Sequence, residues 1–535
     1  MHWKFLLFGI TGNLAKIKIL PGLAEFAILN QDKVSVELIG YSRSTPNLDE
    51  VEKALNSGLK NLQSPKIAKQ NYQINDKINE QTPSQIQTPE DNSTHNLTNI
   101  TFEQGSYQDG KVLFENIAKL KTEERLVVYL AVPPSTFLKF LQNACPYGDQ
   151  NVDFIIEKPF GRDPIEAAKL LNLVESCGLS KQVHFCDHYL FKNSTLLSNL
   201  QREEIQNFFE EFDNEFDDKF DNIDKKSEGS KKYLGQNLEQ NIRQNQNIIE
   251  TDLIKNQSNQ NHKIEIPKLN PVNPICNLSK IHIQILENVD LKGRSGYFDT
   301  TGALKDMWPH LFSLLFLAIE NAGFESNFEV EVVEVFLGQY QSYADEEGLS
   351  NSQTETYFWI KLKIENQSNQ KLDENLNKNS TNYTEIILES GKNLPKKITQ
   401  MTLKSLQIEE KLEGKLEESQ KEKNQIQKTS KILTWSIYPA ESVTLSKQLT
   451  KMKTNSQDND KNETTNETVI NLKREKLDQT NLFELLLNGN KERFVQSEKI
   501  KKSWNWWQKI TDFIDKNQIQ IIVYPDQTLP KIIDE

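Results

Sequence analysis

Two stretches of this 535-residue chain carry side chains that can move a proton and bind an anion. The first is the segment Asp187–Lys192 (DHYLFK), which places a carboxylate, an imidazole and an ammonium group within six residues. An acid beside an imidazole can orient a base, and a nearby ammonium can bind a phosphate. An isolated Asp-His pair is more often structural, so this motif by itself leaves both interpretations open.

The second stretch ends at His310, which follows Asp306 by four residues and directly precedes the apolar run Leu311–Ile319. The run predicts a buried helix, and we expect His310 at its start. A histidine at a helix start that faces a cleft is a candidate general base. The structural alternative is a histidine that caps the helix or is satisfied in the core.

A lysine is fixed at the end of another apolar run, VDFIIE at 152–157, where Glu157-Lys158-Pro159 closes the predicted strand. A lysine at a strand end can reach a substrate hydroxyl in the crevice at the carboxyl edge of a parallel sheet. The Glu-Lys-Pro triplet at this place is typical of several oxidoreductase families.

A nucleotide-binding turn is indicated near the N-terminus. The apolar run 3–8 leads into Gly9-Ile-Thr-Gly12 and then a helical stretch, and small residues there let backbone N–H groups approach a pyrophosphate. The full Gly-x-Gly-x-x-Gly pattern is missing, so a plain strand-to-helix turn fits equally well. Arg43 follows the next predicted strand, where an arginine suits the 2′-phosphate of NADP; a surface arginine is the alternative.

The elements that must position these residues form two groups. Apolar runs at 3–8, 34–41, 126–132 and 152–157 alternate with helical stretches, which predicts a buried parallel sheet. Strand patterns at 279–286, 328–336, 354–364, 384–388 and 403–408 follow without intervening helices, which favours a mainly antiparallel sheet. We therefore expect an α/β Rossmann-like dinucleotide-binding domain over residues 1–186. A larger α+β substrate-binding and dimerisation domain follows over 187–535.

Composition narrows the class of protein. Hydrophobic residues make up 36% of the chain, and the polar excess lies in tracts at about 62–100, 202–266, 365–383, 408–430 and 452–480. Such tracts bury little apolar surface, so we expect disordered or loosely helical insertions. The net charge of −13 argues against a nucleic-acid binder, and no run is long enough for a membrane span. The N-terminus does not read as a signal peptide.

The four cysteines, Cys145, Cys177, Cys186 and Cys276, show no spacing typical of a metal site or a disulfide framework. They indicate a reducing compartment, and we expect a cytoplasmic protein without a bound metal.

Taken in order, these motifs resemble those of the glucose-6-phosphate dehydrogenase family. The turn 8–18, the segment Asp187–Lys192 and the block Gly293–Asp306 each match a family motif. The resemblance extends through nearly all of the chain outside the polar tracts. Further matching segments are 129–137, 158–159, 274–277, 391–397, 437–441, 483–487, Phe494, 504–507 and 524–525.

The resemblance implies NADP-dependent oxidation of glucose 6-phosphate at C1 to 6-phosphogluconolactone, the first step of the oxidative pentose phosphate pathway, with NAD as an alternative acceptor. His310 would take the proton of the C1 hydroxyl, and Asp187 would orient and support the imidazolium. The substrate-binding residues implied are Lys158, His188, Tyr189, Lys192, Glu287, Asp306, Lys392 and Lys397. Those implied for the cofactor are Gly9, Gly12, Leu14, Arg43, Pro133 and Lys158. A homodimer or dimer of dimers is the implied assembly.

Four departures from the family pattern bear on the site. Asn13 stands in place of an aspartate, Phe191 in place of a glycine, and Glu389 in place of an arginine. The fourth is one residue fewer between Asp306 and His310 than in the family. On a continuous helix one residue amounts to a rotation of about 100°. If the missing residue falls in a loop at the helix start, with Pro309 in the first turn, His310 keeps its position.

Two alternatives follow from these departures. One is a catalytically impaired paralogue that binds sugar phosphate or nucleotide without turnover. The other is a different sugar oxidoreductase of the glucose–fructose or inositol dehydrogenase class. The segment Asp187–Lys192 and the tryptophan segment 504–507 count against the second alternative.

Overall fold

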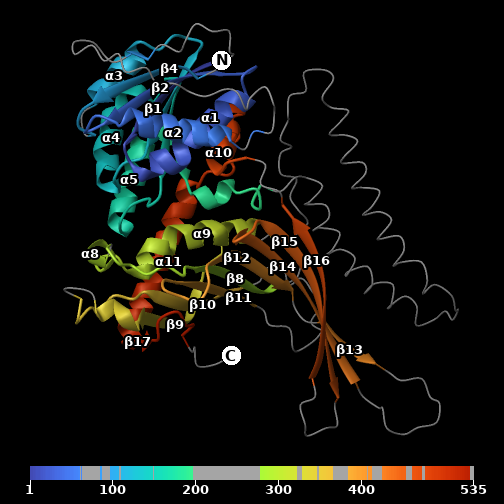
Figure 1. Ribbon diagram of the computed structural model, residues 1–535. Coiled ribbons are helices and arrows are strands. Elements are labelled where there is room, and N and C mark those ends of the chain that lie inside the picture. The colour runs from blue at the N-terminus through green and yellow to red at the C-terminus, as the bar shows by residue number, and fades with distance from the viewer. Residues whose placement is uncertain are drawn as a thin grey trace, which may run out of the picture. The chain divides into compact units, whose positions relative to one another are not determined.

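The N-terminal sheet has the strand order β3-β4-β2-β1-β5-β6-β7 in the computed structural model (Figure 1). Six of these strands run parallel, and β3 pairs antiparallel with β4 at one edge. The strands are β1 (His2–Phe8), β2 (Ser35–Ser42), β3 (Gln85–Ile86), β4 (Leu97–Gln104), β5 (Glu124–Leu130), β6 (Val152–Glu157) and β7 (Val183–Cys186).

The helices between these strands give the sheet its βαβ connections. Every residue of β6 is buried, as expected for a strand of a parallel sheet that is covered on both faces. The helices are α1 (Leu20–Leu29), α2 (Leu48–Leu59), α3 (Lys111–Ala118), α4 (Phe137–Ala144) and α5 (Pro164–Ser176). A π-helical turn, η1 (Ala15–Ile19), precedes α1, and short 3₁₀ turns are η2 (Pro134–Thr136), η3 (Cys145–Tyr147), η4 (Leu179–Lys181) and η5 (His188–Phe191).

The C-terminal sheet has the order β16-β15-β14-β12-β8-β11-β10-β9-β17, and β13 pairs with β14 beside this path. Most neighbours are antiparallel, whereas β8 with β11 and β9 with β17 are parallel. Its strands are β8 (Leu278–Leu286), β9 (Glu331–Tyr340), β10 (Tyr357–Glu365), β11 (Tyr383–Gly391), β12 (Ile398–Ser405), β13 (Ile408–Leu412), β14 (Gln425–Tyr438), β15 (Ser442–Lys453), β16 (Lys461–Asn471) and β17 (Ile521–Tyr524).

Helices join the two sheets. The long helix α9 (Gly302–Asn321) packs on β8, β11, β10 and β12, and it also contacts η5 at the end of the first sheet. Figure 1 shows α9 above the strands of the second sheet and below the N-terminal sheet. Helix α10 (Asp478–Leu487) packs against α1, and α11 (Ser497–Asn517) packs against α5 and β9. The remaining short elements are α8 (Ser295–Phe298) and η7 (Gln341–Asp345).

The structure describes residues 1–60, 62, 85–86, 97–107, 110–148, 150–196, 278–293, 295–321, 328–345, 349–365, 383–405, 408–412, 425–453, 461–472 and 476–530. Both sheets belong to one compact unit formed by residues 1–197 and 276–535. Within the described residues, no helix combines the length and the apolar character that crossing a lipid bilayer requires.

The predicted fold class is confirmed: a Rossmann-like parallel sheet precedes a mostly antiparallel sheet. Three of the five polar tracts were assigned wrongly in part. Strands β3, β13 and β16 lie within them, β4 and β14 begin there, β15 ends there, and α10 begins in the last. Polar residues form these strands because pairing satisfies the backbone N–H and C=O groups, even at 465–469 of β16, where consecutive residues on both faces are exposed. The tract 202–266 and most of 365–383 lie outside the described residues.

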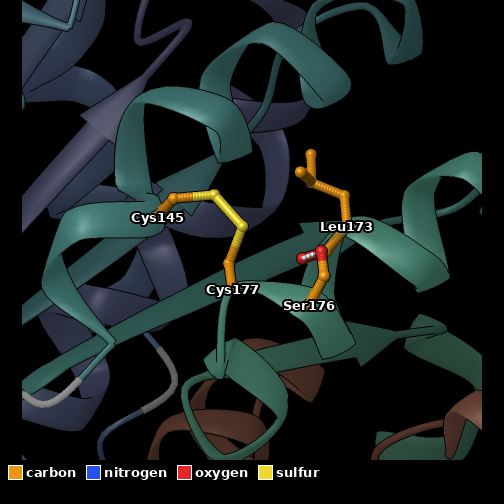
Figure 2. Close-up of a disulfide and its surroundings, with 4 residues drawn as sticks. All are labelled: Cys145, Leu173, Ser176 and Cys177. Atoms are coloured by element: carbon orange, nitrogen blue, oxygen red, sulfur yellow. Dashed lines mark hydrogen bonds between the residues drawn. A yellow bond between two sulfur atoms is a disulfide. The ribbon is translucent and has the colours of Figure 1, made fainter.

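Two of the four cysteines are paired, contrary to the prediction. Cys145 and Cys177 form a disulfide with a Cα–Cα distance of 4.9 Å, while Cys186 is a buried thiol. Figure 2 shows the bond between the ends of α4 and α5, beside the Ser176 hydroxyl that donates to the Leu173 carbonyl. Thirty-two positions separate the two cysteines, so the sequence did not mark them as partners. The correction to that prediction concerns the state of Cys145 and Cys177, which are paired and not separate thiols.

Candidate active site

The centre of the site is a hydrogen bond between two buried residues that are far apart in the sequence. His310 Nδ1 lies 2.8 Å from Asp187 Oδ2 and 2.9 Å from Oδ1. Asp187 is fully buried and His310 is 5% exposed. An ionised carboxylate only accepts hydrogen bonds, so Nδ1 must carry the proton and Nε2 holds the free lone pair. The imidazole is therefore in the tautomer that a general base needs.

Asp187 is positioned by the end of β7. It is the N-cap residue of η5, its carboxylate accepts from the Tyr189 backbone N–H at 3.0 Å, and its carbonyl accepts from the Leu190 N–H. This cap holds the Asp187 carboxylate where it also contacts His310 of α9.

His310 lies inside a helix and not at its start, which corrects the prediction. Helix α9 begins at Gly302, and Pro309 is within it. Asp306 and His310 are therefore four residues apart on one continuous helix and share a face. Both reach partners there, since Asp306 Oδ2 lies 3.4 Å from Lys392 Nζ while His310 bonds Asp187. The shorter spacing thus leaves both side chains at the site.

Burial and charge set the protonation states of the pair. Burial by itself would raise the pKa of Asp187, but the charge and hydrogen bond of His310 outweigh it and hold that pKa well below its usual range. Burial lowers the pKa of His310, and the nearby Lys158 ammonium lowers it further, against the opposing effect of Asp187. At neutral pH the pair consists of a carboxylate and a neutral imidazole.

Two aromatic rings flank His310. The rings of His188 and Tyr189 lie with centroids 5.1 Å and 4.7 Å from that of His310, both nearly perpendicular to it. Burial, then the charges of Lys18 and His310, hold the pKa of His188 well below its usual value. Burial raises the pKa of Tyr189, whose side chain hydrogen bonds Thr399. Both groups are therefore neutral hydrogen-bonding partners at pH 7.

A second charged group stands at the end of β11. The Lys392 ammonium bonds the Glu287 carboxylate and lies 3.7 Å from Met307 Sδ and 3.4 Å from Asp306 Oδ2. Lys392 is 7% exposed, whereas Glu287 and Asp306 are half-buried. The two carboxylates can thus offer oxygen atoms to hydroxyl groups while the ammonium holds them in place.

Lys158 is placed by three neighbouring strand ends. The preceding residue, Glu157, accepts a hydrogen bond from the Tyr129 hydroxyl, and Cys186 bonds with the same two groups. Burial raises the pKa of Glu157, and it raises the pKa of the Cys186 thiol well above the ordinary value. This buried cluster fixes the carboxyl ends of β5, β6 and β7, from which Lys158 and Asp187 project.

One lysine that the sequence analysis did not single out belongs to this group. Burial lowers the pKa of Lys18. The charges that also act on this pKa are those of Asp478, Lys192, Glu157 and Asp187. The sequence signal that could have identified Lys18 is its position two residues after Lys16, just beyond the glycine turn and on the π-helical turn η1. Lys192 itself pairs with Asp478 at 2.7 Å.

The remaining predicted substrate residue and two of the departures contact groups other than the Asp187–His310 pair. Lys397 is exposed, with its ammonium 4.5 Å above the Tyr438 ring, two positions before Thr399. Phe191 is fully buried against Phe494, so its side chain does not narrow the site. Glu389 accepts from Gln284 Nε2 at 2.7 Å and the Tyr357 hydroxyl at 2.8 Å, and it pairs with His282 at 3.1 Å.

The candidate nucleotide residues lie at the carboxyl edge of the N-terminal sheet. Gly9 has a φ of +85°, and a Cβ there would collide with the Ala131 carbonyl oxygen. Gly12 N–H closes the turn on the Gly9 carbonyl at 2.9 Å. Leu14 is half-buried, and Pro133 and Arg43 are exposed; the Arg43 guanidinium lies 5.3 Å above the Tyr107 ring.

The same centre has the spacing of a metal site. The ligand atoms that Asp187, His188 and His310 offer lie within 4.8 Å of one another. The carboxylate and His310 Nδ1 already satisfy each other, so the cluster is hydrogen-bonded as it stands.

A Rossmann-like sheet whose carboxyl edge meets a buried His-Asp pair defines the class of NAD(P)-binding oxidoreductases. Residues 6–196 match the glucose-6-phosphate dehydrogenase NAD binding domain, and residues 270–531 match the glucose-6-phosphate dehydrogenase C-terminal domain. The chain belongs to the glucose-6-phosphate dehydrogenase family.

Individual relatives are distant. The chain is 24% identical to a glucose-6-phosphate 1-dehydrogenase of Caenorhabditis elegans over 398 residues, which is 68% of this chain and 62% of that protein. It is 30% identical to the Saccharomyces cerevisiae enzyme over 199 residues, 36% of each chain. The chain therefore aligns with less than two thirds of the length of these curated relatives.

The fold agrees with a solved structure of a glucose-6-phosphate dehydrogenase in complex with its substrate glucose-6-phosphate. The TM-score is 0.61 at 19% sequence identity, and the match covers 99% of this chain and 95% of that one.

Proposed function

We propose that this protein oxidises glucose 6-phosphate at C1 to 6-phosphogluconolactone with NADP as the acceptor. The observation that carries the proposal is the buried bond between His310 Nδ1 and Asp187, which leaves Nε2 free on a neutral imidazole. Family membership supports the same assignment, since both domains of the family are matched.

His310 is the proposed base. The proton of the C1 hydroxyl passes to His310 Nε2, and the imidazolium that forms is stabilised by the Asp187 carboxylate behind it. Lys158, whose charge already acts on His310, holds the oxygen on C1 and disfavours protonation of the base before substrate binds.

The substrate is held at two ends. His188, Tyr189, Lys192, Lys392 and Lys397 provide the donors for the 6-phosphate, and the half-buried Glu287 and Asp306 accept from sugar hydroxyls. Lys18 adds a positive charge beside Lys192. Several polar groups directed at one small sugar phosphate give strong discrimination, because an analogue that lacks a partner leaves buried groups unpaired.

The residues at the nucleotide end fit a bound dinucleotide. The Gly9–Gly12 turn leaves no room for a side chain at Gly9, and an arginine, with serines on either side, follows β2 where an acidic residue would favour NAD. Gly9, Gly12 and Leu14 would contact the pyrophosphate, Arg43 the 2′-phosphate and Pro133 the adenine side. When bound, the nicotinamide supplies the hydride acceptor.

Cytoplasmic location, a place in the oxidative pentose phosphate pathway and a homodimer or dimer of dimers built on the C-terminal sheet belong to the same proposal. The basis for them is family membership.

A steady-state assay tests the activity directly. We expect reduced-nicotinamide absorbance to grow with glucose 6-phosphate and NADP, more slowly with NAD, and not with unphosphorylated glucose or inositol. Binding of glucose 6-phosphate in a calorimeter without turnover would identify the impaired paralogue instead. Turnover of unphosphorylated sugars would place the chain with other sugar oxidoreductases.

A further inference from the structure

Helix α9 carries both His310 and Asp306, and its first turn is capped by a residue from a different segment. The Leu304 backbone N–H donates to the Glu355 carboxylate at 2.9 Å, and the Ala303 N–H donates to the Glu355 carbonyl, also at 2.9 Å. The first N–H groups of a helix have no partner within the helix. One residue thus supplies two of the missing acceptors.

The helix start is built around this contact. Gly302 has a φ of +73°, and a Cβ at that position would collide with the Glu355 carboxylate. A carboxylate at a helix N-terminus is also favoured by the helix dipole. Burial raises the pKa of Glu355, while its bond to Leu304 opposes the rise.

The neighbouring residue anchors the other half of the site. The Thr356 carbonyl accepts from the Lys392 N–H at 2.9 Å, and the Thr356 hydroxyl accepts from the Tyr340 N–H at 2.9 Å. The dipeptide Glu355-Thr356 therefore ties the helix of the base and the loop of Lys392 to one point before β10.

We propose that Glu355 is a positioning residue that, by capping α9, sets where His310 and Asp306 stand relative to Asp187 and Lys392. The proposal rests on the proposed function of His310 as the base. Along the axis of the same helix, Asp306 lies about 6 Å and His310 about 12 Å from Gly302, so a loosened first turn displaces both side chains. A displacement of about 1 Å at reacting groups can cost roughly a hundredfold in rate.

Three variants test the cap. Glu355→Ala removes the side-chain acceptor, and we expect kcat to fall about ten- to a hundredfold and KM for glucose 6-phosphate to rise. KM for NADP stays within about twofold, because the nucleotide end is not touched. Glu355→Gln keeps an oxygen that accepts from Leu304, so its kcat stays within about threefold of the unmodified protein. Glu365→Ala, an exposed glutamate at the far end of β10, is the matched control and leaves both constants unchanged.

Hydrogen exchange gives a readout that does not require turnover. Amides of 302–310 should exchange faster in Glu355→Ala than in Glu355→Gln or Glu365→Ala. If Glu355→Ala does not fold, Glu355→Asp replaces it, since its shorter side chain does not reach the Leu304 N–H and should show the same loss. The proposal is overturned if the truncated variant keeps kcat within twofold and exchange unchanged, or if Glu355→Gln is impaired equally. Absence of turnover in the unmodified protein refutes the proposed function, and exchange alone then decides the role of Glu355.

Discussion

The Lys192 ammonium lies 2.7 Å from the Asp478 carboxylate, which joins the end of the N-terminal sheet to the first residue of α10. Asp478 is 4% exposed, and its other carboxylate oxygen, Oδ1, is buried without a hydrogen-bond partner among the described residues. A phosphate at this place would share Lys192 with Asp478. The charges of both residues act on the pKa of the nearby Lys18. The pair thus holds an ammonium group ready at the proposed phosphate end.

Lys192→Ala should raise KM for glucose 6-phosphate about ten- to a hundredfold, because a charge-assisted hydrogen bond worth about 1.5–3 kcal/mol is lost. We expect kcat to change far less, since the base is not altered. Steady-state kinetics measure both constants. Lys476→Ala, which removes another lysine beside α10 that pairs with Glu484, is the control. An unchanged KM in the Lys192 variant would exclude this lysine from phosphate binding.

Removal of the base should abolish most of the rate. His310→Ala is expected to lower kcat by about 10²–10⁴ while glucose 6-phosphate still binds in a calorimeter. Asp187→Asn should lower kcat less and shift the acid limb of the pH profile to lower pH, because the imidazolium loses its carboxylate partner. His282→Ala is a matched control, since His282 pairs with the carboxylate of Glu389 on the C-terminal sheet. Retained activity in His310→Ala would refute our assignment of the base.

Arg43 should decide between the two dinucleotides. Arg43→Ala is expected to raise KM for NADP about tenfold or more and to leave KM for NAD within about twofold, because only NADP carries the 2′-phosphate. The ratio of the two specificity constants is the measurement. An equal loss with both cofactors would mean that the arginine supports the fold and not the choice of cofactor.

Stability should fall in mild acid. Burial lowers the pKa values of His184, His188 and His310, so in the folded state these groups stay neutral to lower pH than in the unfolded chain. The unfolded chain therefore binds more protons below about pH 6.5, and the free energy of unfolding decreases as pH falls. Each histidine contributes a slope of up to about 1.4 kcal/mol per pH unit. Urea melts between pH 7.5 and 5.5 check this, and a flat or rising stability over that range would contradict it.

The sequence by itself determined the class of fold and most of the residues at the site. Continuous apolar runs such as 152–157 specify buried parallel strands, and the segment Asp187–Lys192 identified the family motif directly. These signals are local, because both the apolar pattern of a buried strand and the spacing of a motif can be recognised within a short run of consecutive residues. The same locality explains the errors: polar strands such as β16 have no apolar signal, and their pairing partners supply the reason to form.

Only the tertiary structure decided which side chains meet. Asp187 and His310 are 123 positions apart, and the residues around either of them do not indicate that the two side chains come into contact. The start of α9 at Gly302 depends on acceptors from Glu355, which lies beyond the helix in the sequence. The disulfide between Cys145 and Cys177 likewise depends on where α4 and α5 end. Local sequence propensity determines where helices and strands form. Long-range packing and the need to satisfy buried polar groups determine how these elements lie against one another.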